Sequence, residues 1–152
     1  MAWSSTVPAA LTAILGLFRS ADLGGAEVRD GPEVTGSSAL EVVIVGWAGQ
    51  ASDTLAADGT VSVEGLAGSP DREQYEIRCA ALVLDGGGDL MEATARAYQL
   101  AAACGAALAA NRTLSGLVLR AGITSSSLRL DPVDGARATV EFSVACDAYT
   151  AT

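Results

Sequence analysis

The sequence predicts an α+β fold: a mostly antiparallel sheet with one long helix, at about residues 90–110, on one face, and a further helix near the N-terminus. Apolar and polar residues alternate through Glu73–Leu84 and again through Ala138–Tyr149, as in strands with one covered face. Between these segments, Leu90–Asn111 is rich in alanine and repeats apolar residues at helical spacing. A chain of 152 residues, half of them apolar, fits a single domain over residues 1–152 and can bury a core.

The first third of the chain predicts one helix and two strands. Ser5 or Thr6 can cap the helix, and Gly24 with Gly25 can end it. Ala26–Asp30 predicts a short strand. Leu40–Trp47 is β-branched and nearly all apolar, which favours a central strand covered on both faces. The apolar face of the helix consists of Val7, Leu11, Ile14, Leu15 and Phe18.

Residues 48–72 predict an extended loop or a hairpin arm. They are rich in Gly, Ser, Asp and Ala, and a turn signal at Asp58-Gly59 precedes one short alternation, Thr60–Leu66. A strand offered at a sheet edge can pair with a neighbouring molecule, whereas a plain surface loop is the alternative. The residues that this predicts at a subunit contact are Thr60, Val61, Val63 and Leu66.

The second half predicts a continuous strand–helix–strand–strand unit. Asp85–Asp89 makes a turn in which Asp89 caps the long helix, and Glu92 with Arg96 can form an ion pair along that helix. Leu114–Ile123 is expected to be the next strand, followed by a loop that contains Ser125-Ser126-Ser127.

The residue types argue against catalysis. The chain has no histidine, so neither a Cys–His pair nor a Ser–His–Asp triad can form within it. Its cysteines, Cys79, Cys104 and Cys146, lack metal-binding spacing and sit at apolar positions, so we expect them buried and reduced. Gly86–Asp89 lacks the ending that a phosphate-binding P-loop needs. We therefore expect no catalytic residue, cofactor or metal.

Charge is unevenly distributed along the chain. Residues 22–92 hold 14 of the 18 acids and three arginines, a net charge of −11. An acidic block disfavours ordinary nucleic-acid binding but would let DNA slide past without adhering, while the simpler interpretation is that the charge keeps the chain soluble. The apolar run Ala9–Phe18 is shorter than a membrane span, so no membrane contact is expected.

An ordered set of local phrases resembles the tail terminator (tail completion) proteins of long-tailed bacteriophages, in particular those that infect high-GC actinobacteria. The resemblance covers nearly the whole chain and is weakest in 48–70. The phrases are Asp30-Gly31-Pro32, Val45-Gly46-Trp47, Asp71-Arg72-Glu73 with Tyr75–Cys79, Gly88-Asp89, Ala95-Arg96-Ala97-Tyr98, Thr113-Leu114-Ser115-Gly116 and Val140–Cys146.

The resemblance implies a structural virion protein at the head–tail interface, assembled in the host cytoplasm. Such proteins form a ring, commonly a hexamer, that ends polymerisation of the tail tube. The implied partners are further copies of the chain, the major tail tube protein and the head–tail connector, with DNA passing through without specific binding. Acids that could line the lumen are Asp53, Asp58, Glu64, Asp71 and Glu73.

Other functions fit the sequence less closely. The chain could be a different head-to-tail connector component, or a part of a tailocin or gene-transfer agent. From another class, it could be a small ligand-binding domain or an enzyme with a pocket at the sheet edge.

Overall fold

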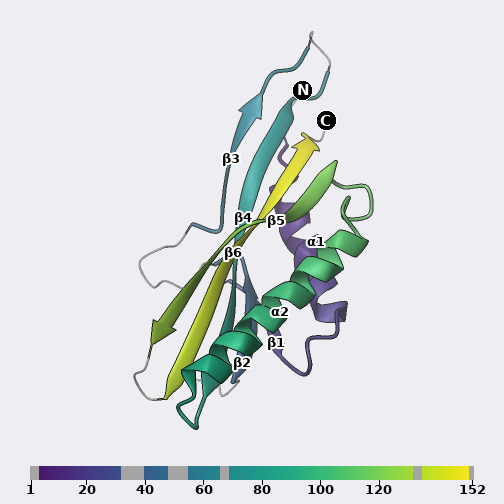
Figure 1. Ribbon diagram of the computed structural model, residues 1–152. Coiled ribbons are helices and arrows are strands. Elements are labelled where there is room, and N and C mark those ends of the chain that lie inside the picture. The colour runs from purple at the N-terminus through teal and green to yellow at the C-terminus, as the bar shows by residue number, and fades with distance from the viewer. Residues whose placement is uncertain (1–3, 32–39, 48–54, 66–68, 132–134, 151–152) are drawn as a thin grey trace.

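The computed structural model describes residues 4–31, 40–47, 55–65, 69–131 and 135–150. These residues form two helices and six strands, which gives the predicted α+β class (Figure 1). In chain order the elements are α1 (Val7–Ser20), β1 (Glu27–Asp30), β2 (Glu41–Val45), β3 (Ala57–Ser62), β4 (Arg72–Asp85), α2 (Leu90–Ala110), β5 (Arg120–Asp131) and β6 (Ala136–Tyr149).

The strands form a sheet in the order β1-β2-β4-β6-β5, and β3 also pairs with β4. The β1–β2 pair is parallel, and the other pairs between described strands are antiparallel. β4 and β6 pair along their whole lengths, from Arg72↔Tyr149 to Asp85↔Ala136. β2 lies between β1 and β4, and Val42–Val45 are buried, which confirms the prediction of an interior strand covered on both faces.

β2 and β3 share one edge of β4. β3 pairs with its first half, from Ala57↔Ile77 to Ser62↔Arg72, and β2 pairs with the second half. The change of partner occurs at Arg78, whose N–H donates to the Ala56 carbonyl (2.9 Å) and whose carbonyl accepts from the Gly46 N–H (2.7 Å). β3, which lies within the segment 48–72 predicted as a loop or hairpin arm, therefore forms a hairpin with the start of β4.

The predicted turn at Asp58-Gly59 is wrong, because both residues lie within β3 and pair with Glu76 and Tyr75. The absence of a side chain at Gly59 makes this pairing possible. A Cβ atom built there would lie 2.4 Å from the Gln74 carbonyl oxygen and 2.5 Å from the Tyr75 Cβ. Gly59 allows the two strands to approach closely. From the sequence alone, a glycine after an aspartate is assigned to a turn, because turns are where glycine most often occurs.

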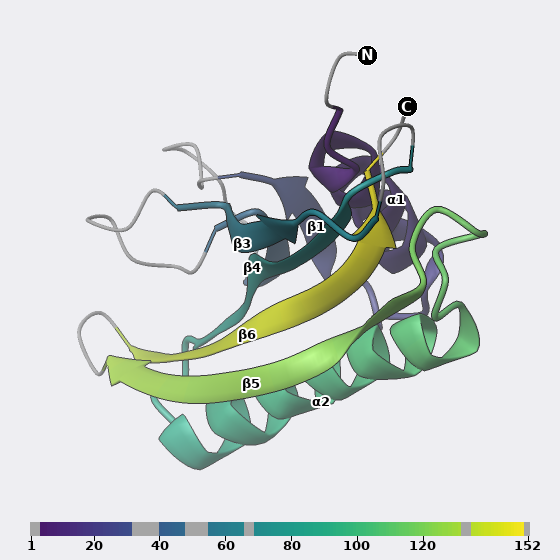
Figure 2. The ribbon, with the colours of Figure 1, turned by 90° about the horizontal axis from the view of Figure 1, so that it is seen from above.

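Both helices pack on one face of the sheet (Figure 2). The buried stripe of α2 meets alternate residues of β4 and β6, and Phe18 of α1 packs against Phe142 of β6 with ring centroids 6.3 Å apart. Burial of these small apolar side chains removes much apolar area from water and supplies the main stabilisation of the fold. The buried residues of α2 are Ala93, Ala97, Leu100, Ala101, Cys104 and Leu108, all members of the predicted stripe.

Arg96 links α2 by hydrogen bonds to β2 and to the segment that follows α1. Its guanidinium donates to the Glu41 carboxylate of β2 (2.7 Å from Nε to Oε2) and to the Leu23 carbonyl (2.8 Å). Arg96 therefore forms its ion pair with Glu41 of β2, on a different element, whereas the sequence predicts a pair with Glu92 along the same helix.

The prediction of a strand over Leu114–Ile123 is wrong in its first half, and the predicted Ser125–Ser127 loop is strand. Leu114 and Ser115 have φ values of 48° and 59°, outside the range of a strand, and the Asn111 side chain holds this turn by accepting from the Ser115 N–H (2.9 Å). β5 begins only at Arg120 and continues through the serines. The run Ser125–Ser127 contains no apolar residue, so the sequence gives no alternation there that would distinguish a strand from a loop.

Candidate functional site

The sheet face opposite the helices carries polar and charged side chains, and the strand register shows which of them share a row. One row runs across the sheet through Thr60, Gln74, Asp147 and Arg120. The next begins at Asp58 and Glu76 and ends at two small residues, Ala145 and Gly122. A sheet covered on one side only presents such a face to solvent or to a partner.

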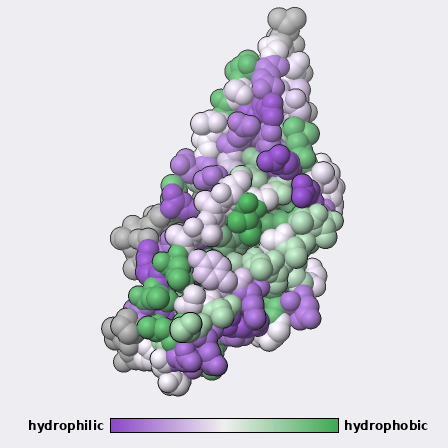
Figure 3. Space-filling model, in the orientation of Figure 1, coloured by the Kyte–Doolittle hydropathy of each residue, from purple (hydrophilic) through white to green (hydrophobic). Residues whose placement is uncertain are grey.

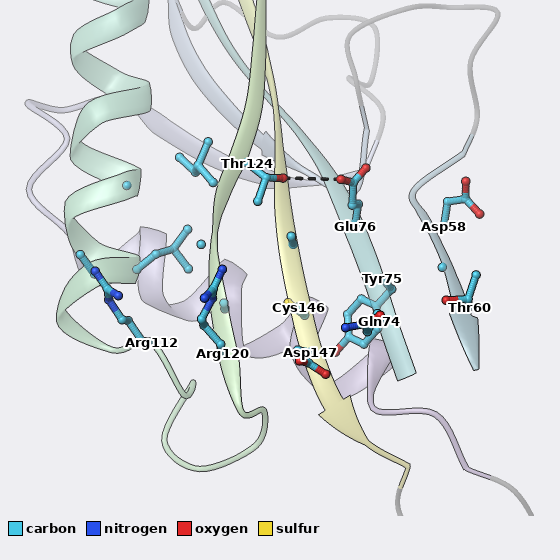
Figure 4. Close-up of a pocket in the computed structure, with 18 residues that line it drawn as sticks. Asp58, Thr60, Gln74, Tyr75, Glu76, Arg112, Arg120, Thr124, Cys146 and Asp147 are labelled. Carbon is cyan, nitrogen blue, oxygen red and sulfur yellow. Dashed lines mark hydrogen bonds between the residues drawn. The ribbon is translucent and has the colours of Figure 1, made fainter. Parts of the chain in front are cut away.

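A groove of about 950 Å³ crosses these rows, where β3, β4, β6 and β5 lie beside the end of α2. Figure 4 shows Asp58, Glu76 and Asp147 on the strands, with Arg112 and Arg120 on the side toward α2. The dashed contact joins the Thr124 hydroxyl to the Glu76 carboxylate at 3.5 Å. Carboxylates, guanidinium groups and hydroxyls arranged in this way can form ion pairs and hydrogen bonds with a partner surface.

Arg72 and Asp147 join the hairpin to β6. Arg72 Nε donates to Asp147 Oδ1 at 2.8 Å, and a second guanidinium nitrogen donates to Oδ2, so the contact is bidentate. The hydrogen bond from Arg72, reinforced by its positive charge, lowers the pKa of Asp147. Arg72 also lies 3.6 Å from the Glu64 carboxylate. The pair anchors the base of the hairpin to the neighbouring strand.

The residues predicted at a subunit contact lie on and beside β3. Thr60 and Val61 are exposed and point to opposite faces of the sheet, as neighbours in a strand must. Val63, just beyond the strand, is 79% exposed. Leu66 lies outside the described residues. The hairpin thus displays apolar side chains at an edge of the sheet.

The acids predicted to line a lumen differ in their exposure. Asp58 and Glu64 are exposed, Asp71 is partly buried, and Asp53 lies outside the described residues. Glu73 is 3% exposed and faces α1, where its carboxylate accepts hydrogen bonds from Ser5 and Thr6. The expectation that Glu73 is a surface acid is therefore wrong, because a contact that spans 67 positions of the sequence buries it.

The open sheet face as a whole is balanced in charge. Since alternate residues of each strand point to the same side, the register assigns five acids and five arginines of β3, β4, β6 and β5 to this face, and β1 adds one of each, Glu27 and Arg29. They interleave, as in the ion pair between Arg129 and Glu141 (3.0 Å). On β3, β4, β6 and β5 the acids are Asp58, Glu76, Asp131, Glu141 and Asp147, and the arginines are Arg72, Arg78, Arg120, Arg129 and Arg137.

The three cysteines are buried and free, as predicted. Burial raises the pKa of Cys104 to about 12 and that of Cys146 to about 11, and it raises the pKa of Cys79 as well. In the part of the chain that the structure describes, no group of three or more Cys, Asp or Glu side chains is placed to hold a metal ion. No helix among the same residues is long and apolar enough to cross a membrane.

Comparison with known proteins identifies the fold. No protein-family model and no curated protein sequence matches the chain. A solved structure does match: a chain of the "Virion of native gene transfer agent (GTA) particle", with a TM-score of 0.58 over 93% of this chain and 94% of that one. The two chains share a fold. Their sequences are 11% identical, so the likeness concerns the arrangement of the elements and not individual residues.

Proposed function

We propose that this protein is a structural virion protein that forms a ring at the head-proximal end of a phage tail tube, ends tube polymerisation and joins the tail to the head connector. The observation that carries the proposal is the fold shared with a chain of a gene transfer agent virion over nearly the full length of both chains. The ordered phrases that resemble tail terminators point to this place in the particle. The role is one of assembly, without catalysis or a cofactor.

Self-association into a ring, commonly of six copies, follows from the same proposal. In the described part of the sheet, β3 and β5 each pair with a neighbour on one side only, so each leaves an edge to offer. The tail tube protein would bind one side of the ring and the head–tail connector the other. The mixed-charge groove supplies groups suited to such protein contacts.

DNA would pass through the ring, and acids in its wall would repel the phosphate backbone. Because acids and arginines interleave across the sheet face, we assign that part to its β3 edge and the adjoining chain, with Asp58, Glu64 and Asp71 as the described candidates and Asp53 as a further one. Reversal of Asp58, Glu64 and Asp71 to Arg should leave assembly intact and slow ejection in a salt-dependent way. Normal ejection at every salt concentration would contradict the lumen assignment.

A part of a gene transfer agent or tailocin is the second candidate, favoured by the source of the structural match. The chain would keep the same place in such a particle, while the DNA content of the particle would differ. Sequencing the DNA packaged in purified particles separates the two: a uniform viral genome indicates a phage, random host fragments a gene transfer agent, and no DNA a tailocin.

Deletion of the coding sequence from a particle-producing strain tests the proposed function. We expect tubes of uncontrolled length and heads without tails in electron micrographs, with both defects restored by the intact chain. Gold-labelled antibody should mark the head-proximal end of normal tails. Tails of normal length that remain joined to heads in the deletion strain, or labelling of the capsid shell, would contradict the proposal.

A further inference from the structure

Three of the described strands, β1, β3 and β5, pair on one side only, and β3 and β5 lie on opposite sides of the β4–β6 pair. β3 pairs with β4 alone and β5 pairs with β6 alone among the described strands, and Figure 2 shows them on the two sides of that pair. Unpaired N–H and C=O groups along an edge form a template for another strand. Each copy of the chain therefore offers one such template on each side.

The two edges are complementary in direction. β3 is antiparallel to β4, β4 to β6, and β6 to β5, so β3 and β5 run in opposite directions within one copy. When copies are related by rotation about an axis along the strands, the β3 edge of one copy meets the β5 edge of the next in an antiparallel arrangement. The alternation of strand direction then continues across the junction without a break.

The edges also match in the character of their faces. Val61 pairs with Glu73 and so lies on the helix-covered face, as do Leu128 and Leu130 through their pairing with Val140 and Ala138. These three side chains are 47%, 40% and 46% exposed in the single chain. Figure 3 shows apolar surface at the lower left, over the far end of β5. A joined sheet would bring apolar side chains together on one face and leave polar ones on the other.

The backbone of β3 is oriented for such pairing. The bond from the Arg78 N–H to the Ala56 carbonyl sets the phase of the ladder, so Asp58 and Thr60 direct their backbone groups toward β4. Gly59 and Val61 consequently direct theirs away from it. β1 is a poorer edge because it has only 4 residues, against 6 in β3 and 12 in β5.

We propose that copies of this chain associate head to tail through antiparallel pairing of the β3 edge of one copy with the β5 edge of the next, so that the sheets join into one continuous ring. This deepens the proposed function and rests on its ring. The proposal identifies the β5 edge as the surface that the β3 hairpin of a neighbouring copy contacts.

Thiol cross-linking of mixed variants tests the pairing, since the three native cysteines are buried. Val61→Cys is mixed in turn with Ser126→Cys, Leu128→Cys and Leu130→Cys, which scan one face of β5. A short bismaleimide should join two copies only in the mixtures, and most strongly at one β5 position. Ser20→Cys, at the exposed end of α1, is the control and should join to none of them.

The scan is run both on concentrated protein and on assembled particles, and each result either supports or overturns the pairing of β3 with β5. Linkage in the Val61→Cys sample alone would mean that two β3 edges meet symmetrically, and linkage of a β5 variant with itself would mean the same for β5; either overturns the proposal. So does the absence of linkage in every mixture in both settings. If the deletion strain makes normal tails while the mixtures still cross-link, the proposed function fails and the edge pairing stands.

Proline substitution gives an independent check. Val61→Pro removes an N–H that points away from β4, so the melting temperature should stay close to that of the parent while association between copies, measured by light scattering and by incorporation into particles, is lost. Thr60→Pro removes an N–H that bonds to β4 and should lower the melting temperature. A Val61→Pro variant that stays folded and still assembles as the parent does would count against the pairing.

Discussion

Glu73, on β4, places its carboxylate at the N-terminus of α1, where Oε1 accepts a hydrogen bond from the Thr6 backbone N–H at 2.6 Å. Oε2 accepts from the Ser5 hydroxyl at 2.9 Å, and the Thr6 hydroxyl also reaches Oε1. The first N–H groups of a helix have no partner within it, and the helix dipole favours a negative charge there. Glu73 thus caps α1 and ties the hairpin strand to the N-terminal helix.

Glu73→Gln should lower the free energy of unfolding by about 1–3 kcal/mol, because a buried set of hydrogen bonds loses its charge and one acceptor. Glu76→Gln, three positions along the same strand but exposed, is the matched control and should change stability by no more than about 0.5 kcal/mol. Urea denaturation followed by circular dichroism measures both. Equal stability of the two variants would show that the carboxylate of Glu73 contributes nothing specific.

Gly59→Ala should destabilise the hairpin. The added Cβ would meet the Gln74 carbonyl oxygen at 2.4 Å, and since this atom belongs to the backbone, the strands must separate. Overpacking of this kind costs about 1–3 kcal/mol. Gly86→Ala, where a Cβ meets nothing within 4 Å, is the control and should be neutral or slightly stabilising. Thermal melting and the rate of proteolysis within 57–77 measure the effect, and an undamaged Gly59→Ala hairpin would contradict the close approach.

Cys79, Cys104 and Cys146 should resist thiol reagents in the native protein at pH 8. Their side chains are buried and burial raises their pKa values, to about 11 for Cys146, so little reactive thiolate forms. In denaturant all three should label rapidly. Mass spectrometry counts the labels. Rapid native modification of any one of them would mean that the core opens at that residue far more often than this packing allows.

The sequence predicts those parts of the fold in which local pattern and burial agree. The stripe of α2 and the alternation of β6 were predicted because each packs one face on the core. The sequence misplaces β5 because the serine run in its middle gives no apolar alternation. It assigns Asp58-Gly59 of β3 to a turn because a glycine needed for close packing resembles one needed for a positive φ. The cap of α1 by Glu73 depends on a tertiary contact that no local pattern contains.

The candidate surfaces follow the same rule. The exposed valines of the hairpin could be selected from the sequence, because alternation in a polar segment is a local signal. The groove could not, since its lining comes from four strands and the end of α2, and the register that brings Asp58, Glu76 and Asp147 together is set by the β3–β4 and β4–β6 pairings.

The bidentate pair between Arg72 and Asp147 should make stability depend on pH in the acid range. Hydrogen bonding to Arg72 lowers the pKa of Asp147 in the folded protein, whereas an aspartate in the unfolded chain has a pKa of about 3.9. The pair therefore stabilises the fold fully at pH values above the unfolded pKa, and this contribution is lost as the pH falls through the lower, folded pKa.

Asp147→Asn should be less stable than the parent at pH 7, and the difference should vanish at the acid end of the series. Arg72→Met should behave in the same way, and the double variant should lose little more than either single one, because the two side chains act together. Urea denaturation at a series of pH values from 7 down to about 2.5 measures the three differences. A stability difference for Asp147→Asn that is constant across this range would mean that ionisation of Asp147 is not coupled to folding, and additive losses in the double variant would mean that Arg72 stabilises the hairpin through other contacts, such as the one with Glu64.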